Sequence, residues 1–192
     1  MSEKIDLGSQ GFIYPMPMVL IGSDRGDRPT FMPAAWINRV QYTPARIAVG
    51  MNKTHATNEG IREHGEFSAC IPDESMLELT DWCGLNSALR GADKASQFEV
   101  FRGRLAHAPL VSECPLCLEC TVHKVVDLGS HELFIGEIAG TWTEQRYLDD
   151  GGNPDIEKMR PFMLTMPDNR YWRVGAQIGR AWAAGRSYEP RP

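Results

Sequence analysis

The segment that organises the chain joins an apolar run to the start of a helix, and it reads Arg46-Ile47-Ala48-Val49-Gly50-Met51-Asn52-Lys53-Thr54-His55-Ala56-Thr57. Its polar half begins a helical pattern that runs from Thr54 to His64. The first turn of a helix presents unpaired backbone N–H groups and a partial positive charge. The hydroxyls of Thr54 and Thr57 and the charge of Lys53 add donors, so the segment is a candidate anion site. For such a turn taken alone, an ordinary capped helix is the more common explanation of the same residues.

Strand patterns before this segment indicate an antiparallel fold. Phe12–Gly22 is typical of a lead-in followed by a strand, Ser23–Pro29 of a polar hairpin connection, and Phe31–Val40 of a second strand. The apolar run Arg46–Met51 is the third strand. Because short turns join the three strands before any helix, we expect an antiparallel meander.

Downstream, the pattern predicts further strands and one irregular loop. Gly65 is placed to end the helix that starts near Thr54. The loop over residues 84–95 is rich in small polar residues, and a loop of this kind in a compact domain is often functional. The remaining expected elements are a strand over 66–72, a helix capped by Asp73, a long hairpin of 116–126 with 131–142, and a last strand over 161–166. Many strands with few helices predict a closed or partly closed antiparallel barrel, since closure removes exposed edges.

Length and composition indicate one domain spanning residues 1–192, with a C-terminal extension from about residue 171. The chain is 42% hydrophobic and 23% charged, and its formal net charge of −5 argues against a nucleic-acid-binding face. The N-terminal residues lack the pattern of a signal peptide, and no apolar run approaches the roughly 20 residues of a membrane span. We therefore expect a cytoplasmic protein without nucleic-acid or membrane partners.

The five cysteines are an odd number, unlike a secreted disulfide framework. Cys114, Cys117, Cys120 and His123 recur every three residues, which suggests a metal or cluster ladder. Successive side chains of a strand point to opposite faces, so a spacing of three alternates faces and does not converge on one ion. We expect buried thiols and no metal site.

The common catalytic motifs of nucleotide-binding proteins, serine hydrolases and zinc proteases do not occur in the chain. Two aromatic positions remain candidates for a site. Trp36 follows Pro33-Ala34-Ala35, where small residues let a flat ring approach the backbone, although a core tryptophan fits as well. His131 lies at a turn-to-strand junction, where a solvated turn histidine is the alternative. The other four histidines, His55, His64, His107 and His123, have polar neighbours and are predicted to be surface residues.

Taken in order, several short motifs make the chain resemble the flavin reductase-like, FMN-binding split-barrel family, and within it the flavoredoxin branch. The matching residues are Tyr14-Pro15-Met16-Pro17, Ala34-Ala35-Trp36, Lys53-Thr54-His55-Ala56-Thr57, Gly65-Glu66-Phe67, Asp81-Trp82-Cys83-Gly84, Asp93-Lys94 with Phe98, Glu113-Cys114-Pro115 with Leu118-Glu119-Cys120, and Gly129-Ser130-His131-Glu132-Leu133-Phe134-Ile135-Gly136-Glu137. A weaker match follows at Pro161-Phe162. The resemblance implies a mainly β fold, a six-stranded antiparallel split β-barrel with flanking helices, and a homodimer.

The resemblance also implies FMN as cofactor, with its phosphate at the opening segment and its ring near Trp36 and His131. The implied cofactor-binding residues are Thr30, Met32, Pro33, Ala34, Ala35, Trp36, Asn52, Lys53, Thr54, Thr57, Lys94, His131 and Phe162. His131 is also the implied catalytic residue, in contact with the ring or with an incoming nicotinamide, and Phe162 is expected to cover the site. Two departures concern the ring contacts, because Pro33 stands where relatives often carry a hydroxyl residue and Thr30 where many carry Asn.

Three functions are consistent with these residues. The first is an FMN-dependent oxidoreductase that uses NADH or NADPH to reduce flavin, ferric iron or a similar acceptor. The second is an electron carrier that receives electrons from a redox protein partner. The third is a metal-binding module that uses Cys114, Cys117 and Cys120. A flavin performs the redox steps itself, so the first two need no acid–base or nucleophile motif.

Overall fold

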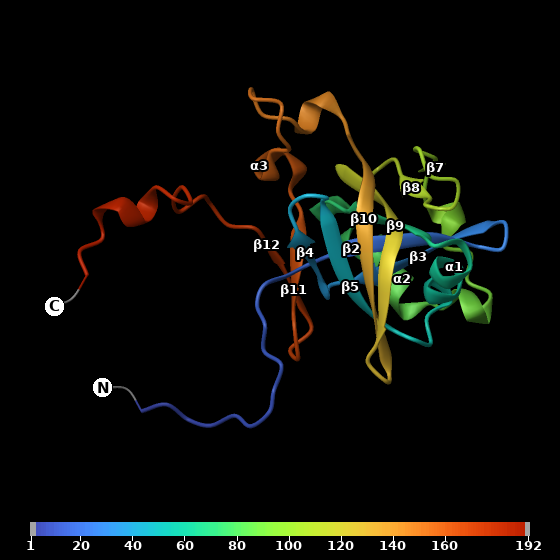
Figure 1. The fold of residues 1–192 in the computed structure, drawn as a ribbon, viewed down its shortest axis with the longest axis horizontal. Helices are drawn as coiled ribbons and strands as arrows, with labels where there is room; N and C mark the ends of the chain where they lie inside the picture. The colour runs from blue at the N-terminus through green and yellow to red at the C-terminus, as the bar shows by residue number, and fades with distance from the viewer. Residues whose placement is uncertain (1–2, 191–192) are drawn as a thin grey trace.

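The computed structural model describes residues 3–190 and is built around one curled antiparallel sheet of seven strands (Figure 1). The strand order is β3-β2-β6-β9-β10-β5-β4. The strands are β2 (Val19–Arg25), β3 (Arg28–Ala34), β4 (Ile37–Gln41), β5 (Arg46–Asn52), β6 (Glu66–Ile71), β9 (Leu116–Asp127) and β10 (His131–Thr143).

The sheet curls into a split barrel because its two edge strands follow one another in the chain. β3 ends at Ala34 and β4 begins at Ile37, so only Ala35 and Trp36 separate the two edges. Three Cα–Cα steps of about 3.8 Å hold the edges within about 11 Å of each other at this end. The fully buried apolar side chains of the barrel interior include Ile21, Val49, Phe67 and Phe134.

The split barrel predicted from the sequence is confirmed, whereas the predicted meander is wrong. The sequence predicts one strand over Phe31–Val40, but the structure has the end of β3, a break, and β4, which gives seven strands instead of six. The β2–β3 and β4–β5 hairpins lie at opposite edges of the sheet, with β6, β9 and β10 between them. Pro33 has no N–H to donate to a second neighbour, which suits β3 to an edge position.

Helix α1 (Ala56–His64) lies against β2. It ends where the sequence predicts, since Gly65 has φ 67° and its N–H donates to the carbonyl of Ile61 at 2.9 Å. A Cβ on Gly60 would lie 1.9 Å from the carbonyl oxygen of Asp24, so glycine permits this close packing. The helix therefore starts at a fixed position relative to the sheet.

A second apolar cluster lies on the other face of the sheet, beneath α2 (Leu77–Leu85). As predicted, Asp73 caps the start of this region, where its carboxylate accepts from the N–H of Ser75 at 2.9 Å. The cluster includes Leu20, Phe31, Cys70, Met76, Cys83, Phe98, Leu110 and Val111. The shorter elements of the chain are η1 (Glu74–Met76), η2 (Ala88–Arg90), η3 (Ala95–Gln97), β7 (Val100–Phe101), β8 (Leu110–Val111), η4 (Gln145–Tyr147), α3 (Ile156–Met159) and η5 (Ala184–Ser187).

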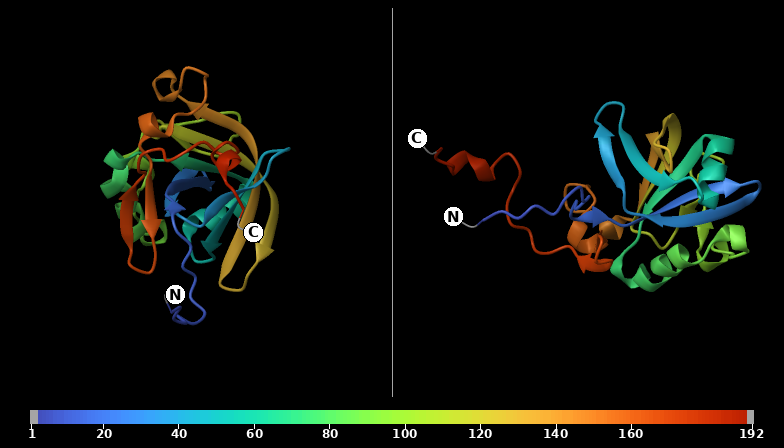
Figure 2. Two further views of the ribbon diagram at one scale, coloured as in Figure 1. Left: turned by 90° about the vertical axis from the view of Figure 1, so that its left-hand side faces the viewer. Right: turned by 90° about the horizontal axis from the view of Figure 1, so that it is seen from below.

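The two ends of the chain meet in a three-stranded sheet of β1 (Met16–Pro17), β11 (Phe162–Thr165) and β12 (Arg170–Arg173), in the order β1-β11-β12. Beyond this sheet both terminal arms project from the same side of the body (Figures 1 and 2). Ile13 and Trp182 are examples of apolar side chains that the arms leave exposed. No helix within residues 3–190 has the length and apolar character needed to cross a membrane.

Candidate functional site

A cavity of about 520 Å³ opens where β3, the start of α1 and the loop after α2 meet. We refer to it as the cationic cavity. Its lining residues are Thr30, Met32, Pro33, Thr54, His55, Ala56, Thr57, residues 83–90 and Lys94. The irregular loop that the sequence marks as a functional candidate therefore forms one wall of the cavity.

The start of α1 faces this cavity without a side-chain cap. Asn52 Oδ1 accepts from the N–H of Thr54 at 3.0 Å and from its hydroxyl at 2.9 Å, which turns the chain into the helix. His55 occupies the N-cap position with an extended backbone, and its side chain makes no capping hydrogen bond. Ala56 and Thr57 line the cavity, so first-turn N–H groups and the helix dipole are available to an anion there.

Two buried polar groups in the cavity wall lack a partner within residues 3–190. The hydroxyl oxygen of Thr30 is buried without a hydrogen bond. Lys94 is only 7% exposed, and this burial lowers the pKa of its ammonium group. The neighbouring Cys83 thiol opposes the shift, and no carboxylate contributes to it. Burial in turn raises the pKa of Cys83 to about 11, so that thiol stays neutral beside the lysine. An unpaired buried cation and hydroxyl suit a ligand that carries negative charge and hydrogen-bond acceptors.

Basic and aromatic groups converge at the rim of the cavity. Burial lowers the pKa of His55, and the charges of Lys94 and His131 lower it further, which places the three groups together. The His131 and Trp36 ring centroids are 5.2 Å apart with planes tilted by 32°. Ser130 Oγ lies 2.9 Å from His131 Nδ1. Trp36 is half exposed, so part of its ring is open to contact with a planar ligand.

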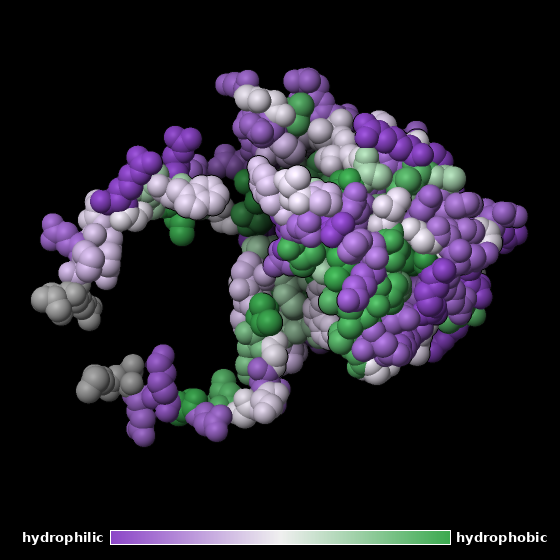
Figure 3. All heavy atoms as spheres, in the orientation of Figure 1, coloured by the Kyte–Doolittle hydropathy of each residue, from purple (hydrophilic) through white to green (hydrophobic). Residues whose placement is uncertain are grey.

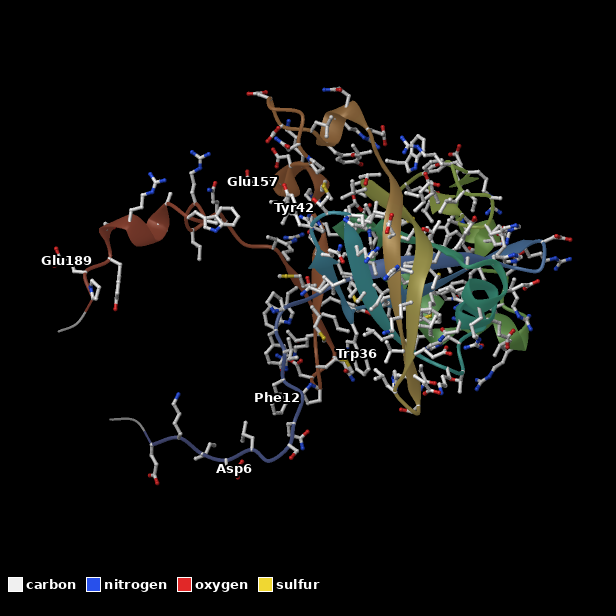
Figure 4. All side chains as sticks on the ribbon, in the orientation of Figure 1. Asp6, Phe12, Trp36, Tyr42, Glu157 and Glu189 are labelled. Carbon is white, nitrogen blue, oxygen red and sulfur yellow. The ribbon has the colours of Figure 1, made fainter. Side chains whose placement is uncertain are left out.

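Trp36 also lines a second space, an apolar cavity of about 690 Å³ between the N-terminal arm and the sheet. Its wall includes Phe12, Pro15, Trp36, Val40, Leu133 and Pro167. Figure 4 shows Phe12 and Trp36 where the arm meets the body. The His131–Trp36 pair therefore links the rim of the cationic cavity with the apolar one.

The structure distributes the sequence-predicted site residues over several places. Six line the cationic cavity, namely Thr30, Met32, Pro33, Thr54, Thr57 and Lys94. Ala35 and Trp36 line the apolar cavity, Asn52 forms the turn into α1, and Ala34 is buried in the barrel interior. His131 lies beside Trp36 at the rim.

Lys53 and Phe162 lie apart from both cavities. Lys53 follows the end of β5, and its Nζ donates to Oδ1 of Asp127 at the end of β9 at 2.6 Å, so its charge is already paired. Phe162 is 2% exposed and packs against Tyr171, with ring centroids 5.5 Å apart, because β11 pairs with β1 and β12. Phe162 is not among the lining residues of the cationic cavity, whereas it was expected to cover the site.

Ten of the lining residues were not among the predicted site residues, and they include His55, Cys83, Ser87 and Arg90. His55 is exposed, as predicted for a surface residue, and it also lines the cavity at the N-cap position of α1. A signal for Ser87 and Arg90 was present, since both lie in the loop marked as functional, but no spacing rule selects them within it. Folding alone brings that loop against the start of α1.

The cysteine ladder splits between the two faces of the sheet, as strand geometry predicts. Cys120 points into the barrel interior, whereas Cys114 and Cys117 belong to the second apolar cluster with Cys70. Within residues 3–190 no group of three or more His, Cys, Asp or Glu side chains is arranged to hold a metal ion. Cys120 therefore does not converge on one point with Cys114 and Cys117.

Comparisons with known proteins agree with this fold and site. The family model described as flavin reductase like domain matches residues 11–159. The crystal structure of flavoredoxin from Methanosarcina acetivorans is similar, with 44% identity, a TM-score of 0.93, and coverage of 97% of this chain and 99% of that one. Flavoredoxin of Desulfovibrio vulgaris (Miyazaki F) shows 32% identity and a TM-score of 0.89, covering 96% of this chain and 100% of that one.

Curated relatives are more distant. A ferric-chelate reductase (NAD(P)H) from Archaeoglobus fulgidus is 28% identical over 127 residues, which cover 62% of this chain and 71% of the relative. An uncharacterised protein from Aeropyrum pernix is 29% identical over 183 residues, and the match covers 93% of this chain and 66% of that longer protein. With the family model matched over most of its length and the split barrel in place, the chain belongs to the flavin reductase-like family of FMN-binding split-barrel proteins.

Proposed function

We propose that this chain is an electron carrier that binds FMN in the cationic cavity and receives electrons from a redox protein partner. The observation that carries the proposal is the pair of unpartnered buried groups, Lys94 and Thr30, beside an uncapped helix start. The similarity to two flavoredoxins over nearly the whole chain favours the carrier over an enzyme.

The two ends of FMN match different parts of the site. The start of α1, with the hydroxyls of Thr54 and Thr57, suits the phosphate, and Arg90 in the facing loop supplies a further positive charge. Thr30 and Lys94 suit the polar edge of the ring, and the Trp36–His131 pair suits its flat face. Bound FMN supplies the hydride and one-electron chemistry, so the chain needs only to bind it, orient it and set the local charge.

The second candidate is an NAD(P)H-dependent reductase of flavin or ferric iron. The apolar cavity next to Trp36 has room for a planar donor, and the relative from Archaeoglobus fulgidus carries a reductase name at 28% identity. In this alternative His131 is the catalytic residue, because it lies at the rim between the two cavities and can orient the donor.

Anaerobic stopped-flow spectroscopy of the FMN-loaded protein separates the two functions. The carrier proposal expects one FMN per chain, full bleaching by dithionite, and bleaching by NADH or NADPH no faster than that of free FMN. Bleaching by either nicotinamide on a catalytic timescale, with a rate that saturates with its concentration, overturns the carrier in favour of the reductase. The absence of bound FMN after reconstitution overturns both.

We further propose that the chain works as a homodimer formed over the outer face of β5 and β10. Leu133 and Ile135 of β10 are half-buried apolar residues on that face and lie opposite Gly50 and Ala48 of β5, beside the apolar cavity that Leu133 and Ala48 line. Figure 3 shows apolar atoms gathered over these strands, beside the projecting arms. Two chains of 21.5 kDa should therefore sediment as one particle, and Ile135→Lys should yield monomers. Wild-type protein that sediments as a monomer at micromolar concentration contradicts the dimer.

A further inference from the structure

Three thiols that the proposed function does not use are gathered on the outer side of β6 and β9. Cys117 lies directly opposite Cys70 in the β6–β9 ladder, so the two side chains share one face. Cys114 lies three residues before Cys117, and Cys117 Sγ donates to the carbonyl oxygen of Cys114 at 3.9 Å. Cys117 Sγ also donates to the carbonyl of Val111 at 3.3 Å. The arrangement brings the two ends of the Cys114-Pro115-Leu116-Cys117 segment close together within one buried cluster.

A separate cavity of about 330 Å³ gives access to two of these thiols. Cys114 and Cys117 are in its wall, together with the ring pair Phe101 and Trp142, whose centroids are 6.3 Å apart. Cys70 is fully buried and is not among the lining residues. A small reagent can therefore reach Cys114 and Cys117 while Cys70 stays behind them.

We propose that Cys114 and Cys117 form a reversible disulfide by exchange with a small disulfide that enters this cavity. The thiolate of Cys114 attacks one sulfur of the small disulfide, which breaks its S–S bond and releases one small thiol. Cys117 then gives up its proton and attacks the mixed disulfide at Cys114, which releases the second small thiol. The protein pair loses two electrons and two protons, and the small disulfide gains both, so the exchange balances without the flavin.

The environment of the thiols makes the exchange slow at neutral pH and faster in alkali. Burial, followed by the hydrogen bonds with Cys117 and Cys70, raises the pKa of Cys114 well above its ordinary value. The thiolate needed for attack is therefore scarce at pH 7, and the rate should rise through alkaline pH. Slow exchange of this kind suits a pair of thiols that is protective or responds slowly, and it does not suit a disulfide that forms and breaks in rapid turnover.

The test counts thiols in the FMN-loaded, full-length protein after equilibration with mixtures of reduced and oxidised glutathione. Acid quenching, alkylation in denaturant and peptide mass spectrometry should show two of the five thiols lost, at positions 114 and 117, and dithiothreitol should restore both. No loss at any glutathione ratio, while the same chain unfolded in guanidinium forms disulfides, overturns the proposal. A bond that joins Cys70 to Cys117 also overturns the assigned pair.

Single substitutions give an independent readout. Cys117→Ser should stop the exchange at a stable glutathione adduct on Cys114, and Cys114→Ser should lose no thiol. Cys70→Ser should still form the bond. Cys120→Ala is the matched control, because Cys120 is equally buried on the same strand but faces the barrel interior, and it should behave as wild type. The circular-dichroism spectrum of each variant checks its fold, and loss of the bond in Cys120→Ala or its persistence in Cys114→Ser contradicts the assignment.

Discussion

Replacing Lys94 with Met removes the buried positive charge of the cationic cavity and keeps a flexible side chain of similar length. If Lys94 donates a charged hydrogen bond to FMN, its loss costs about 1.5–3 kcal/mol of binding free energy. Since about 1.4 kcal/mol corresponds to a factor of ten in Kd, FMN affinity should fall by roughly 10-fold to 150-fold.

The same substitution weakens FMN binding but should not weaken the folding of the apoprotein. Burial lowers the pKa of Lys94 below its unfolded value, so near neutral pH the charged lysine opposes folding of the empty protein. Its replacement by Met relieves this penalty. Apoprotein stability should hold or rise while FMN affinity falls, a combination that general damage to the fold does not produce.

Flavin fluorescence titration of the apoprotein measures the first effect, and urea unfolding of the apoprotein measures the second. Lys53→Met is the matched control, because Lys53 is paired with Asp127 at 2.6 Å on an exposed part of the sheet. Its loss should change FMN affinity by less than about 1 kcal/mol, or about fivefold. An affinity of Lys94→Met within twofold of wild type, or a larger loss in Lys53→Met, would falsify the role assigned to Lys94.

Three further predictions test the site and its support. His55→Gln should flatten the pH dependence of FMN affinity. Burial and the nearby charge of Lys94 lower the pKa of His55 in the apoprotein, whereas a bound phosphate raises it. Wild-type affinity for FMN should therefore show an extra rise as the pH falls through the region around 6.5, and the variant should lack this rise. Titrations of both proteins in the same buffers cancel the ionisation of the phosphate itself, and equal slopes count against the prediction. Thr30→Val removes a buried hydroxyl that lacks a partner, so apoprotein stability in urea should rise by about 1 kcal/mol while FMN affinity falls, and a less stable apoprotein contradicts this reasoning. Glu119→Gln should destabilise the protein by about 2–3 kcal/mol in urea unfolding. The buried Glu119 carboxylate accepts hydrogen bonds from two backbone N–H groups and from the Trp142 indole, and an amide cannot fully replace them. Unchanged stability of this variant argues against the importance of these hydrogen bonds.

Local chemistry made much of the fold predictable. The alternation of β9 and β10, the glycine at the end of α1 and the capping Asp73 act through neighbours in sequence, and each is found where the sequence predicts it. The order of strands in the sheet is different, because it depends on which distant strands pair. The meander prediction failed for this reason. The predicted strand Phe31–Val40 is broken after Ala34, so that β3 pairs with β2 and β4 pairs with β5 at opposite edges of the sheet, with β6, β9 and β10 between the two hairpins.

The site shows the same division. Residues with a local signature, such as Thr54 and Thr57 at the start of α1, could be selected from the sequence and line the cavity. Charge pairing could not be foreseen, because it depends on contacts across the fold. Lys53 and Lys94 are equivalent cations in the sequence. In the fold, Lys53 is paired with Asp127, whereas Lys94 is buried and no carboxylate contributes to its pKa shift.

By itself, the sequence determined the alternation of β9 and β10, the end of α1 at Gly65 and the separation of Cys117 from Cys120 onto opposite faces, since all three follow from backbone geometry over a few residues. Tertiary structure alone decided which groups meet. Burial and distance are properties of the closed barrel, and they bring Lys94, Thr30 and the start of α1 around one cavity and place Cys70 behind Cys114 and Cys117. Pairing energies, desolvation and access all depend on these long-range contacts, which no short stretch of the chain encodes.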